Sequence, residues 1–373
     1  MVSHYDVCVV TTIHQDYDAR IYDRGLKSLV ESGFKIVLVS PWKKADQSSV
    51  NHDWRHVVPV KSRVGRVLLG FRTFVECLKV DTKVFHIHDI DFLSWAVLLK
   101  FIKRAEVIYD CHENYPEEIL YNRAWIHAWL RWPIACLTRL IENMLCRMVS
   151  NCVVVVPSLY DRFKKIGCNV ELIRNFPNVK VCSDIDHNKG LIYIGAVSHA
   201  YGMDTLIEIA RKLKKQGHNY RITVVDKFKS NIKKSDFADI VNNELLNVEI
   251  VERVRPEDLY KIMKLGHIGL SVEKDLPNMH LGYRGKIFEY MAYGVPVIAS
   301  AVDSNKYLVG KYDSGLLVEP DDVDGFVSSI VGIYNDIERL NYYIGNGYNA
   351  INSEFTWHIE REKLIKYVGK LCH

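Results

Sequence analysis

The alternation of short apolar runs with amphipathic stretches is the feature that most restricts the fold of this chain. From residue 6 to about residue 174, strand-length runs such as DVCVVTTI, KIVLVS, HVVPV and CVVVVP alternate with helical patterns such as RIYDRGLKSLVESG and a long helix expected at about 121–149. The alternation begins again at LIYIGA and continues through YRITVVD, HIGLSV and SGLLVEP. Strands separated by helices are typical of parallel sheets that helices cover. The sequence therefore predicts an α/β fold whose architecture occurs twice.

A change of composition separates the two patterns. The segment FPNVKVCSDIDHNKG, at about 176–190, is rich in turn residues and poor in apolar ones. A chain of 373 residues also suits two domains better than one core. We predict Rossmann-like domains at 1–178 and 179–356, with a C-terminal helix at about 357–373 that packs back on the first. Since ligands collect at the carboxyl ends of such strands, we expect a site in a cleft between the two facing domains.

Composition and charge exclude several classes of protein. The chain has 48% hydrophobic and 25% charged residues, which is typical of a well-folded globular protein. A net charge of +4 does not argue for nucleic acid, but it permits anionic substrates or an anionic membrane surface. The first residues lack the pattern of a leader peptide, and no run of about 18 uncharged apolar residues occurs. We expect a cytoplasmic protein that can also associate peripherally with the inner face of the membrane.

Several cofactor motifs are absent from the sequence. No G-x-G-x-x-G follows the first strand, where TTIHQDYDAR stands, and no G-x-x-x-x-G-K-[ST] occurs. The nine cysteines form no C-x-x-C pair, which favours reduced thiols over a zinc site. A D-x-D at Asp89 and Asp91 could hold a divalent metal, but a strand end followed by an N-capping aspartate gives the same letters. We expect no metal and no cofactor.

Polar residues follow another apolar run, IYDCHENYPEE. Asp110, His112 and Glu113 stand where this strand ends, and alternation along a strand lets Asp110 and His112 share one face. A neutral histidine can donate to an anion or a hydroxyl, and a nearby carboxylate can fix its tautomer. A buried structural histidine is the alternative.

The stretch RGKIFEYMAYGVPVIAS, at 284–300, combines a helix, a glycine stop and a buried strand. Lys286, Glu289 and Tyr293 recur at spacings of three and four, so they lie along one side of the helix. Gly294 ends the helix. An intrahelical pair between Lys286 and Glu289 would explain these charges without any function.

The order HIHD, IYDCHE, IRNFPN, LIYIGA and GKIFEYMAYGVPVIAS resembles the retaining, sugar-nucleotide-dependent glycosyltransferases of family 4, which have the GT-B fold. The resemblance covers nearly the whole chain. It implies that Glu289 binds the nucleotide ribose, and that His112 contacts the donor sugar or its phosphate. It also implies phosphate contacts from Arg284 and Lys286.

The resemblance implies further contacts with the nucleotide sugar at Gly195, Tyr283 and Gly285. Candidates for the acceptor side are His14, Asp89 and Glu113. Two positions depart from the family's pattern. Leu281 stands where a second glutamate is frequent, and Tyr201 stands where a basic residue commonly precedes a glycine.

These observations favour an enzyme of hexosyltransferase type that needs no metal. We expect it to move a sugar, with retention, from a UDP- or GDP-sugar to a glycan or lipid-linked saccharide in cell-surface polysaccharide biosynthesis. A sugar-nucleotide epimerase of GT-B type and a non-catalytic sugar-nucleotide-binding protein are the alternatives.

Two basic stretches remain, KSRVGRVLLGFRTFVECLK and YNRAWIHAWLRWPIACLTRL. In the second, Trp125, Trp129 and Trp132 fall on one helical face. Such a face usually belongs to a core, and the alternative is a surface that lies on anionic lipid.

Overall fold

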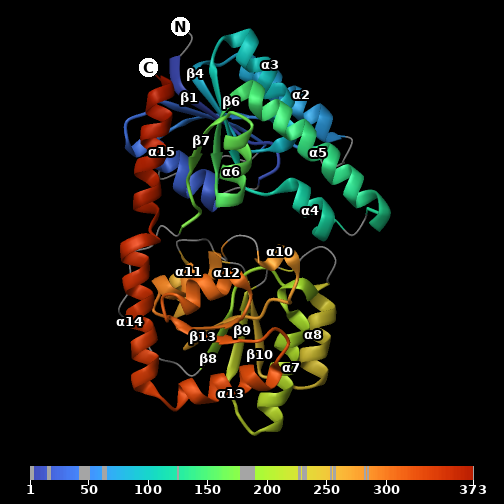
Figure 1. Cartoon of the computed structure of the whole chain (residues 1–373), viewed down its shortest axis with the longest axis vertical. Helices are drawn as coiled ribbons and strands as arrows, with labels where there is room; N and C mark the ends of the chain where they lie inside the picture. The colour runs from blue at the N-terminus through green and yellow to red at the C-terminus, as the bar shows by residue number, and fades with distance from the viewer. Residues whose placement is uncertain are drawn as a thin grey trace. The chain divides into compact units, whose positions relative to one another are not determined.

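The computed structural model consists of two compact units, each with its own sheet (Figure 1). It describes residues 4–14, 18–41, 51–60, 65–123, 126–176, 190–225, 228, 233–252, 254, 258–280, 283 and 285–372. The first unit comprises Met1–Asn175 with Trp357–His373, and the second comprises Phe176–Thr356. The sequence predicts this boundary at 178/179.

The first unit has a seven-stranded parallel sheet in the order β3-β2-β1-β4-β5-β6-β7. Its central strands are buried apolar runs, as expected for a sheet that is covered on both faces. The strands are β1 (His4–Val10), β2 (Ile36–Ser40), β3 (Asp53–His56), β4 (Asp81–Ile87), β5 (Glu106–Cys111), β6 (Ser150–Val154) and β7 (Asn169–Leu172).

Helices cover both faces of this sheet. Side chains of α2, α3, α5 and α6 pack with one set of alternating strand residues, which includes Cys8, Phe85 and Tyr109. Side chains of η1, α1 and α15 pack with the other set, which includes Val7 and Val84. The helices are η1 (Ala19–Leu26), α1 (Lys27–Glu31), α2 (Gly65–Leu78), η2 (Ile90–Phe92), α3 (Leu93–Lys103), α4 (Tyr115–Asn122), α5 (Ala128–Val149), α6 (Pro157–Lys165) and α15 (Trp357–Cys372).

The C-terminal helix α15 is part of the core of the first unit. The indole of Trp357 is buried, and its Nε1 donates to Oγ of Ser28 at 2.9 Å. Glu360 is fully buried and accepts from the backbone N–H of Arg174 at 2.8 Å and from its guanidinium. A segment that follows the second unit in sequence thus completes the first one.

The second unit repeats the architecture with a six-stranded parallel sheet in the order β10-β9-β8-β11-β12-β13. The strands are β8 (Gly190–Tyr193), β9 (Arg221–Val225), β10 (Val248–Val251), β11 (Ile268–Ser271), β12 (Val297–Ser300) and β13 (Gly315–Val318).

Two apolar clusters fill the two faces of this second sheet. One includes side chains of α7, α8 and α13, and the other includes side chains of α9, α11 and η5. The helices are η3 (His199–Tyr201), α7 (Met203–Lys215), α8 (Lys234–Asn243), α9 (Leu259–Met263), α10 (Pro277–His280), α11 (Gly285–Ala292), α12 (Asp303–Asn305), η5 (Lys306–Gly310), α13 (Val323–Tyr334) and α14 (Ile337–Glu354). Among the described residues, no helix is long and apolar enough to cross a membrane.

The structure differs from the expected elements in a few places. The apolar run HVVPV is not a strand, because β3 ends at His56 and Pro59 has no N–H with which to pair. The single long helix expected at about 121–149 is instead α4 and α5, and α6 was not predicted. The first turns after β1 form a π-helix, η1, that is capped by the side chain of Asp18. Of the described cysteines only Cys136 is exposed.

Candidate active site

In the first unit, polar side chains gather where three neighbouring strands end. The strand order reverses between β1 and β4, and β5 lies beside β4. In open parallel sheets, ligands bind outside the carboxyl ends of the strands at such a reversal. The segments that follow these three strands carry His14, Asp89 and His112, all of which were predicted site residues.

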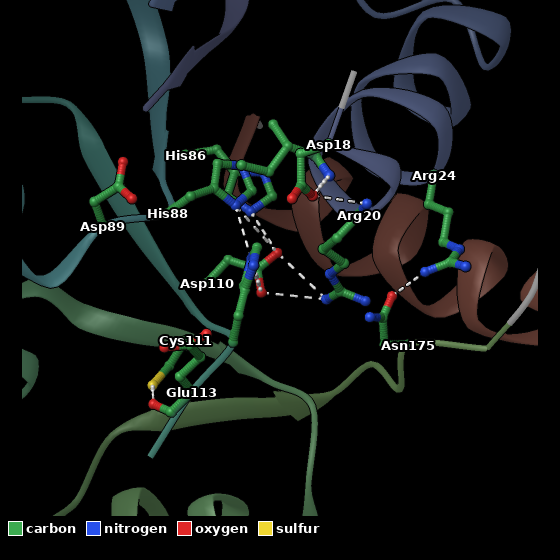
Figure 2. A network of polar contacts seen from close by, with 12 residues as sticks. Asp18, Arg20, Arg24, His86, His88, Asp89, Asp110, Cys111, Glu113 and Asn175 are labelled. Atoms are coloured by element: carbon green, nitrogen blue, oxygen red, sulfur yellow. Dashed lines mark hydrogen bonds and ion pairs between the residues drawn. The ribbon is translucent and has the colours of Figure 1, made fainter. Parts of the chain in front are cut away.

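The carboxylate of Asp110 is the centre of this region (Figure 2). It is buried at the end of β5, and its two oxygens lie 3.2 and 3.3 Å from Nη2 of Arg20, which comes from η1. Nε2 of His86 lies 3.2 Å away from it, and Nδ1 of His88 lies 3.7 Å away. Burial by itself raises the pKa of Asp110, but Arg20 and the histidines hold it well below its ordinary value.

His112 is held on this carboxylate by one side of its ring. Its Nε2 lies 3.3 Å from Oδ1 of Asp110 and 3.0 Å from Nδ1 of His88. The predicted proximity of Asp110 and His112 is therefore confirmed. Burial and the neighbouring ring of His86 hold the pKa of His88 well below its ordinary value, so His88 is neutral. The side chain of His112 is 13% exposed, which leaves part of the ring accessible.

Asp89 fixes the loop that follows β1. Its Oδ2 accepts from the backbone N–H of Thr12 at 2.5 Å and from the hydroxyl of Thr11 at 2.8 Å. It occupies the N-cap position of η2, but its side chain makes no capping hydrogen bond there. Asp89 thus has the expected position of an N-cap residue after a strand end, but its carboxylate binds the loop after β1 instead of the helix. Asp91 accepts from the hydroxyl of Thr12 at 2.9 Å, and burial together with the charge of Asp89 raises the pKa of Asp91 to about 6.

His14 bridges two carboxylates from different elements. Its Nδ1 lies 3.4 Å from Oδ2 of Asp18, and its Nε2 lies 3.3 Å from Oδ1 of Asp89. Burial lowers the pKa of His14, but the hydrogen bond to Asp18 and the charge of Asp89 outweigh burial and raise it from 6.5 to about 8. The ring centroids of His14 and His112 lie 5.5 Å apart. A cation and His112 thus stand together at this edge of the sheet.

The remaining acceptor-side candidate, Glu113, is exposed directly after His112. Among the described residues, His86, His88 and Asp110 also form a group whose ligand atoms all lie within 4.8 Å of one another. These three residues could in principle hold a metal ion. The guanidinium of Arg20 already shares the same carboxylate, however, and a second cation beside it would be repelled.

The second unit gathers charge at the equivalent place. Its strand order reverses between β8 and β11. Glu273, just after β11, is fully buried, and Nζ of Lys286, from α11, lies 2.8 Å from its Oε1. Ser271 and Asn305 donate to the same carboxylate at 2.8 and 3.1 Å. Nζ of Lys286 also stands 4.7 Å from the ring centroid of Tyr193, so Lys286 is an enclosed cation and not a solvated one.

The loop after β8 comes close to this lysine. Gly195 has a φ of +107°, which side chains rarely adopt, and a Cβ built there would lie 3.6 Å from Cδ of Lys286. Gly202 has a φ of +77°, and a Cβ there would meet the carbonyl oxygen of Val272 at 1.6 Å. The two glycines let the backbone pass close to the ends of β8 and β11.

The other predicted residues of the second unit lie on or beside α11. Gly285 is the first residue of this helix, and Glu289 is half-buried one turn further on. The ring of Tyr283 stacks on that of Tyr307, with centroids 5.2 Å apart. Arg284 lies outside the described residues.

The sequence motifs pointed to no role for several residues of both clusters, namely Asp18, Arg20, His86, His88 and Glu273. A signal existed for the two histidines, because His86 lies in β4 and His88 directly after it, so that alternation puts both on one face. Glu273 also follows a buried strand, as a site residue would. No pattern in the sequence marks Arg20 as the partner of Asp110, since 90 positions separate them.

Comparisons with solved structures define the class of this fold. Sucrose-phosphate synthase from Thermosynechococcus elongatus has a TM-score of 0.74 at 14% identity, over 99% of both chains. HepE from Anabaena in complex with UDP-glucose has a TM-score of 0.72 at 13% identity, over 98% of this chain and 100% of its own. WaaG, a glycosyltransferase involved in lipopolysaccharide biosynthesis, has a TM-score of 0.65 at 12% identity, over 97% of this chain and 100% of its own. The chain has the two-domain α/β fold of the GT-B glycosyltransferases.

Family models assign both halves of the sequence. Residues 26–180 match Glycosyltransferase Family 4, and residues 188–336 match Glycosyl transferases group 1. No curated protein matches the chain in sequence. The two matches together with the fold identify a glycosyltransferase that is similar to family 4.

The two carboxylates beside His14 predict a raised pKa of its imidazole, which can be measured. We expect its imidazole to titrate at about pH 8 in the folded protein, followed by NMR of the ring protons. Asp18→Asn removes the hydrogen-bonded carboxylate, so the pKa should fall toward 6.5. The bound proton stabilises the fold below pH 6.5, and this contribution is lost as the pH rises through 8.

Asp204→Asn serves as the control, because it removes the carboxylate that pairs with the exposed His199. It should leave the titration of His14 unchanged. A midpoint near 6.5 in the unmodified protein would show that His14 does not bridge the two carboxylates.

Proposed function

We propose that this glycosyltransferase moves a sugar, with retention at the anomeric carbon, from a nucleoside diphosphate sugar to a glycan or lipid-linked saccharide. The observation that supports this proposal most directly is that, in both sheets, polar residues cluster where the strand order reverses. The complex of HepE with UDP-glucose favours UDP over GDP as the nucleotide. A role in cell-surface polysaccharide biosynthesis is part of the proposal. Analysis of the products from an α-linked donor tests the proposal. We expect a free nucleoside diphosphate and an acceptor that is longer by one α-linked sugar.

In this proposal the second unit binds the nucleotide. The carboxylate of Glu289 accepts hydrogen bonds from the ribose hydroxyls. The N–H groups at the start of α11 and the cation of Lys286 stabilise the charge that develops on the leaving diphosphate. Because Glu273 already neutralises part of that cation, we assign a share of the diphosphate charge to Arg284. Gly195 lets the backbone approach the phosphates, and Tyr283 and Gly285 flank them.

In the first unit we assign His112 to the donor sugar or its phosphate. The polar contacts that the structure gives His112 within the described residues go through Nε2. Nδ1 is therefore the ring atom left to exchange a hydrogen bond with the substrate. Asp110 and His88 fix the orientation of the ring, as the partners of a catalytic histidine must. His14, Asp89 and Glu113 are proposed for the acceptor side.

Metal independence is part of the same proposal, and we also propose that no cofactor is needed. We expect transfer to continue in EDTA, since a helix terminus and basic side chains supply positive charge to the diphosphate. The initial rates with EDTA and with added Mg²⁺ should agree within about twofold, against the 10²- to 10³-fold that loss of one charge-stabilising group typically costs. Activity that EDTA abolishes and Mg²⁺ or Mn²⁺ restores would contradict this, and would implicate Asp89 with Asp91 or the group of His86, His88 and Asp110.

The ribose contact predicts the effect of Glu289→Gln. The change keeps the shape of the side chain but removes its charge, and a charge-assisted hydrogen bond contributes roughly 1.5 to 3 kcal/mol. UDP should bind roughly 10- to 150-fold more weakly by calorimetry, with the melting temperature of the free protein unchanged. Glu338→Gln, at an exposed position of α14, is the control and should bind UDP normally. Equal affinities in the two variants would remove Glu289 from the nucleotide site.

His112 should affect turnover more than binding. An interaction made mainly in the transition state lowers kcat with little change in ground-state affinity. We expect His112→Ala to bind UDP normally and to transfer sugar at least about 100-fold more slowly, within the range for a positioned donor, acid or base. His199→Ala is the control, at an exposed histidine of the second unit. If His112→Ala unfolds, His112 is a core residue, and if it turns over normally, His112 is not in the active site.

A further inference from the structure

The outer side of three neighbouring helices in the first unit is apolar although it faces solvent. The helices α2, α3 and α5 lie side by side (Figure 1). Nζ of Lys103 bonds the carbonyl of Leu78 at the end of α2, and Nζ of Lys100 bonds the carbonyl of Val149 at the end of α5. We call their exposed large apolar side chains the apolar face: Val67, Leu68, Phe71, Leu98, Phe101, Ile102, Trp129, Trp132, Leu137, Leu140, Ile141, Met144 and Met148.

On a surface helix, apolar side chains ordinarily face the core and polar side chains face solvent, but on α5 large apolar side chains face solvent. The inner side buries Ala135, Cys146 and Val149, as well as the charged Glu142. The outer side presents Trp129 and Trp132, at 76% and 69% exposure, and large aliphatic residues follow at helical spacing. Of the two interpretations that the sequence left open, core or surface, the structure places Trp129 and Trp132 on the surface. Trp125 lies outside the described residues.

The apolar face is larger than a monomer ordinarily leaves in water. A Phe or Trp side chain has roughly 150 to 250 Å² of surface that it can bury, and the four aromatic residues of this face are 49% to 76% exposed. The four exposed aromatic residues with their aliphatic neighbours therefore exceed the few hundred Å² that are usual for the largest patch of a monomer. A surface of this kind marks an interaction site.

The charges around the apolar face are cationic. Arg66 and Arg72 on α2, Arg104 after α3 and Arg147 on α5 are exposed, whereas the exposed Arg139 of α5 pairs with Glu117 of α4 at 3.2 Å. The sequences of the three helices contain only two carboxylates, Glu76 and Glu142. Lys79 pairs with the first at 2.6 Å, and the second is buried against Arg162. The partner that fits this face therefore has an apolar interior and an anionic surface.

We propose that this face binds the surface of an anionic phospholipid bilayer. Tryptophans that enter the interface, aliphatic side chains beneath them and arginines at the headgroups are what such a surface recognises. A second copy of this chain fits less well. A two-fold interface would bring the arginines of both copies together without carboxylates to pair with them. The proposal does not depend on the proposed reaction.

Sedimentation of the full chain with vesicles tests the proposal. We expect it to bind vesicles of phosphatidylglycerol mixed with phosphatidylcholine, and to bind pure phosphatidylcholine at least about tenfold more weakly, because each arginine near an anionic surface contributes roughly fivefold. Arg72→Gln with Arg147→Gln should remove most of the preference for anionic lipid. Trp129→Gln with Trp132→Gln should weaken binding to both kinds of vesicle.

The control is Leu245→Gln with Ile337→Gln, two exposed apolar positions of the second unit at 78% and 62% exposure. It should sediment like the unmodified chain, and circular dichroism should show that all variants are folded. Absence of vesicle binding, or equal losses in the control and in the tryptophan variant, would overturn the proposal. So would a lipid-free dimer that the tryptophan changes dissociate, which would assign the face to a second copy. The assay contains no sugar nucleotide, so its failure would leave the proposed transfer reaction untouched.

Discussion

The buried carboxylate of Asp110 is the interaction on which the first unit depends. Arg20 balances its charge, and the guanidinium of Arg20 also reaches the carbonyl of Arg174 and lies 5.5 Å from the ring centroid of Trp357. One ion pair thus connects the end of β5 with η1, the segment after β7 and the C-terminal helix. A buried carboxylate without such partners would be neutral or would destabilise the fold. Because the same carboxylate holds His112, the geometry of the candidate site is set by the packing of the whole unit.

The second unit also has a buried carboxylate, and other residues neutralise its charge. Glu273 and Lys286 are enclosed at the reversal of its strand order, and Ser271 and Asn305 occupy further positions around the carboxylate. Buried ion pairs add little net stability once desolvation is counted, so their main effect is to fix position. In both units an acid at a strand end is paired with a base from a neighbouring helix. This holds helix termini and backbone loops at the place where we propose the contacts with phosphates and sugar hydroxyls.

The sequence predicted most strands and the class of fold, because buried parallel strands are continuous apolar runs between amphipathic helices. It also placed Asp110 and His112 together, since alternation along one strand decides that contact. It did not predict the partners that come from other elements, such as Arg20 or Glu273, because tertiary packing sets those distances. The division between α4 and α5 was missed although a proline in the first turn of α4 marks a helix start earlier than expected. The sequence also left open whether Trp129 and Trp132 are exposed. Helical periodicity shows that they share one face of a helix, but it does not show whether that face packs against protein or faces solvent.

The burial of Trp357 and Glu360 in the first unit has a consequence for synthesis on the ribosome. The second unit is one continuous segment and can fold as soon as it has emerged. The first unit lacks α15 until the second has been made, which takes roughly 10 to 40 s at ordinary translation rates. During that time the side of its sheet near Ser28 and Arg174 lacks its cover, and Arg174 lacks the carboxylate of Glu360. The first unit therefore reaches its final packing only in a late step, when its last helix covers this side of the sheet.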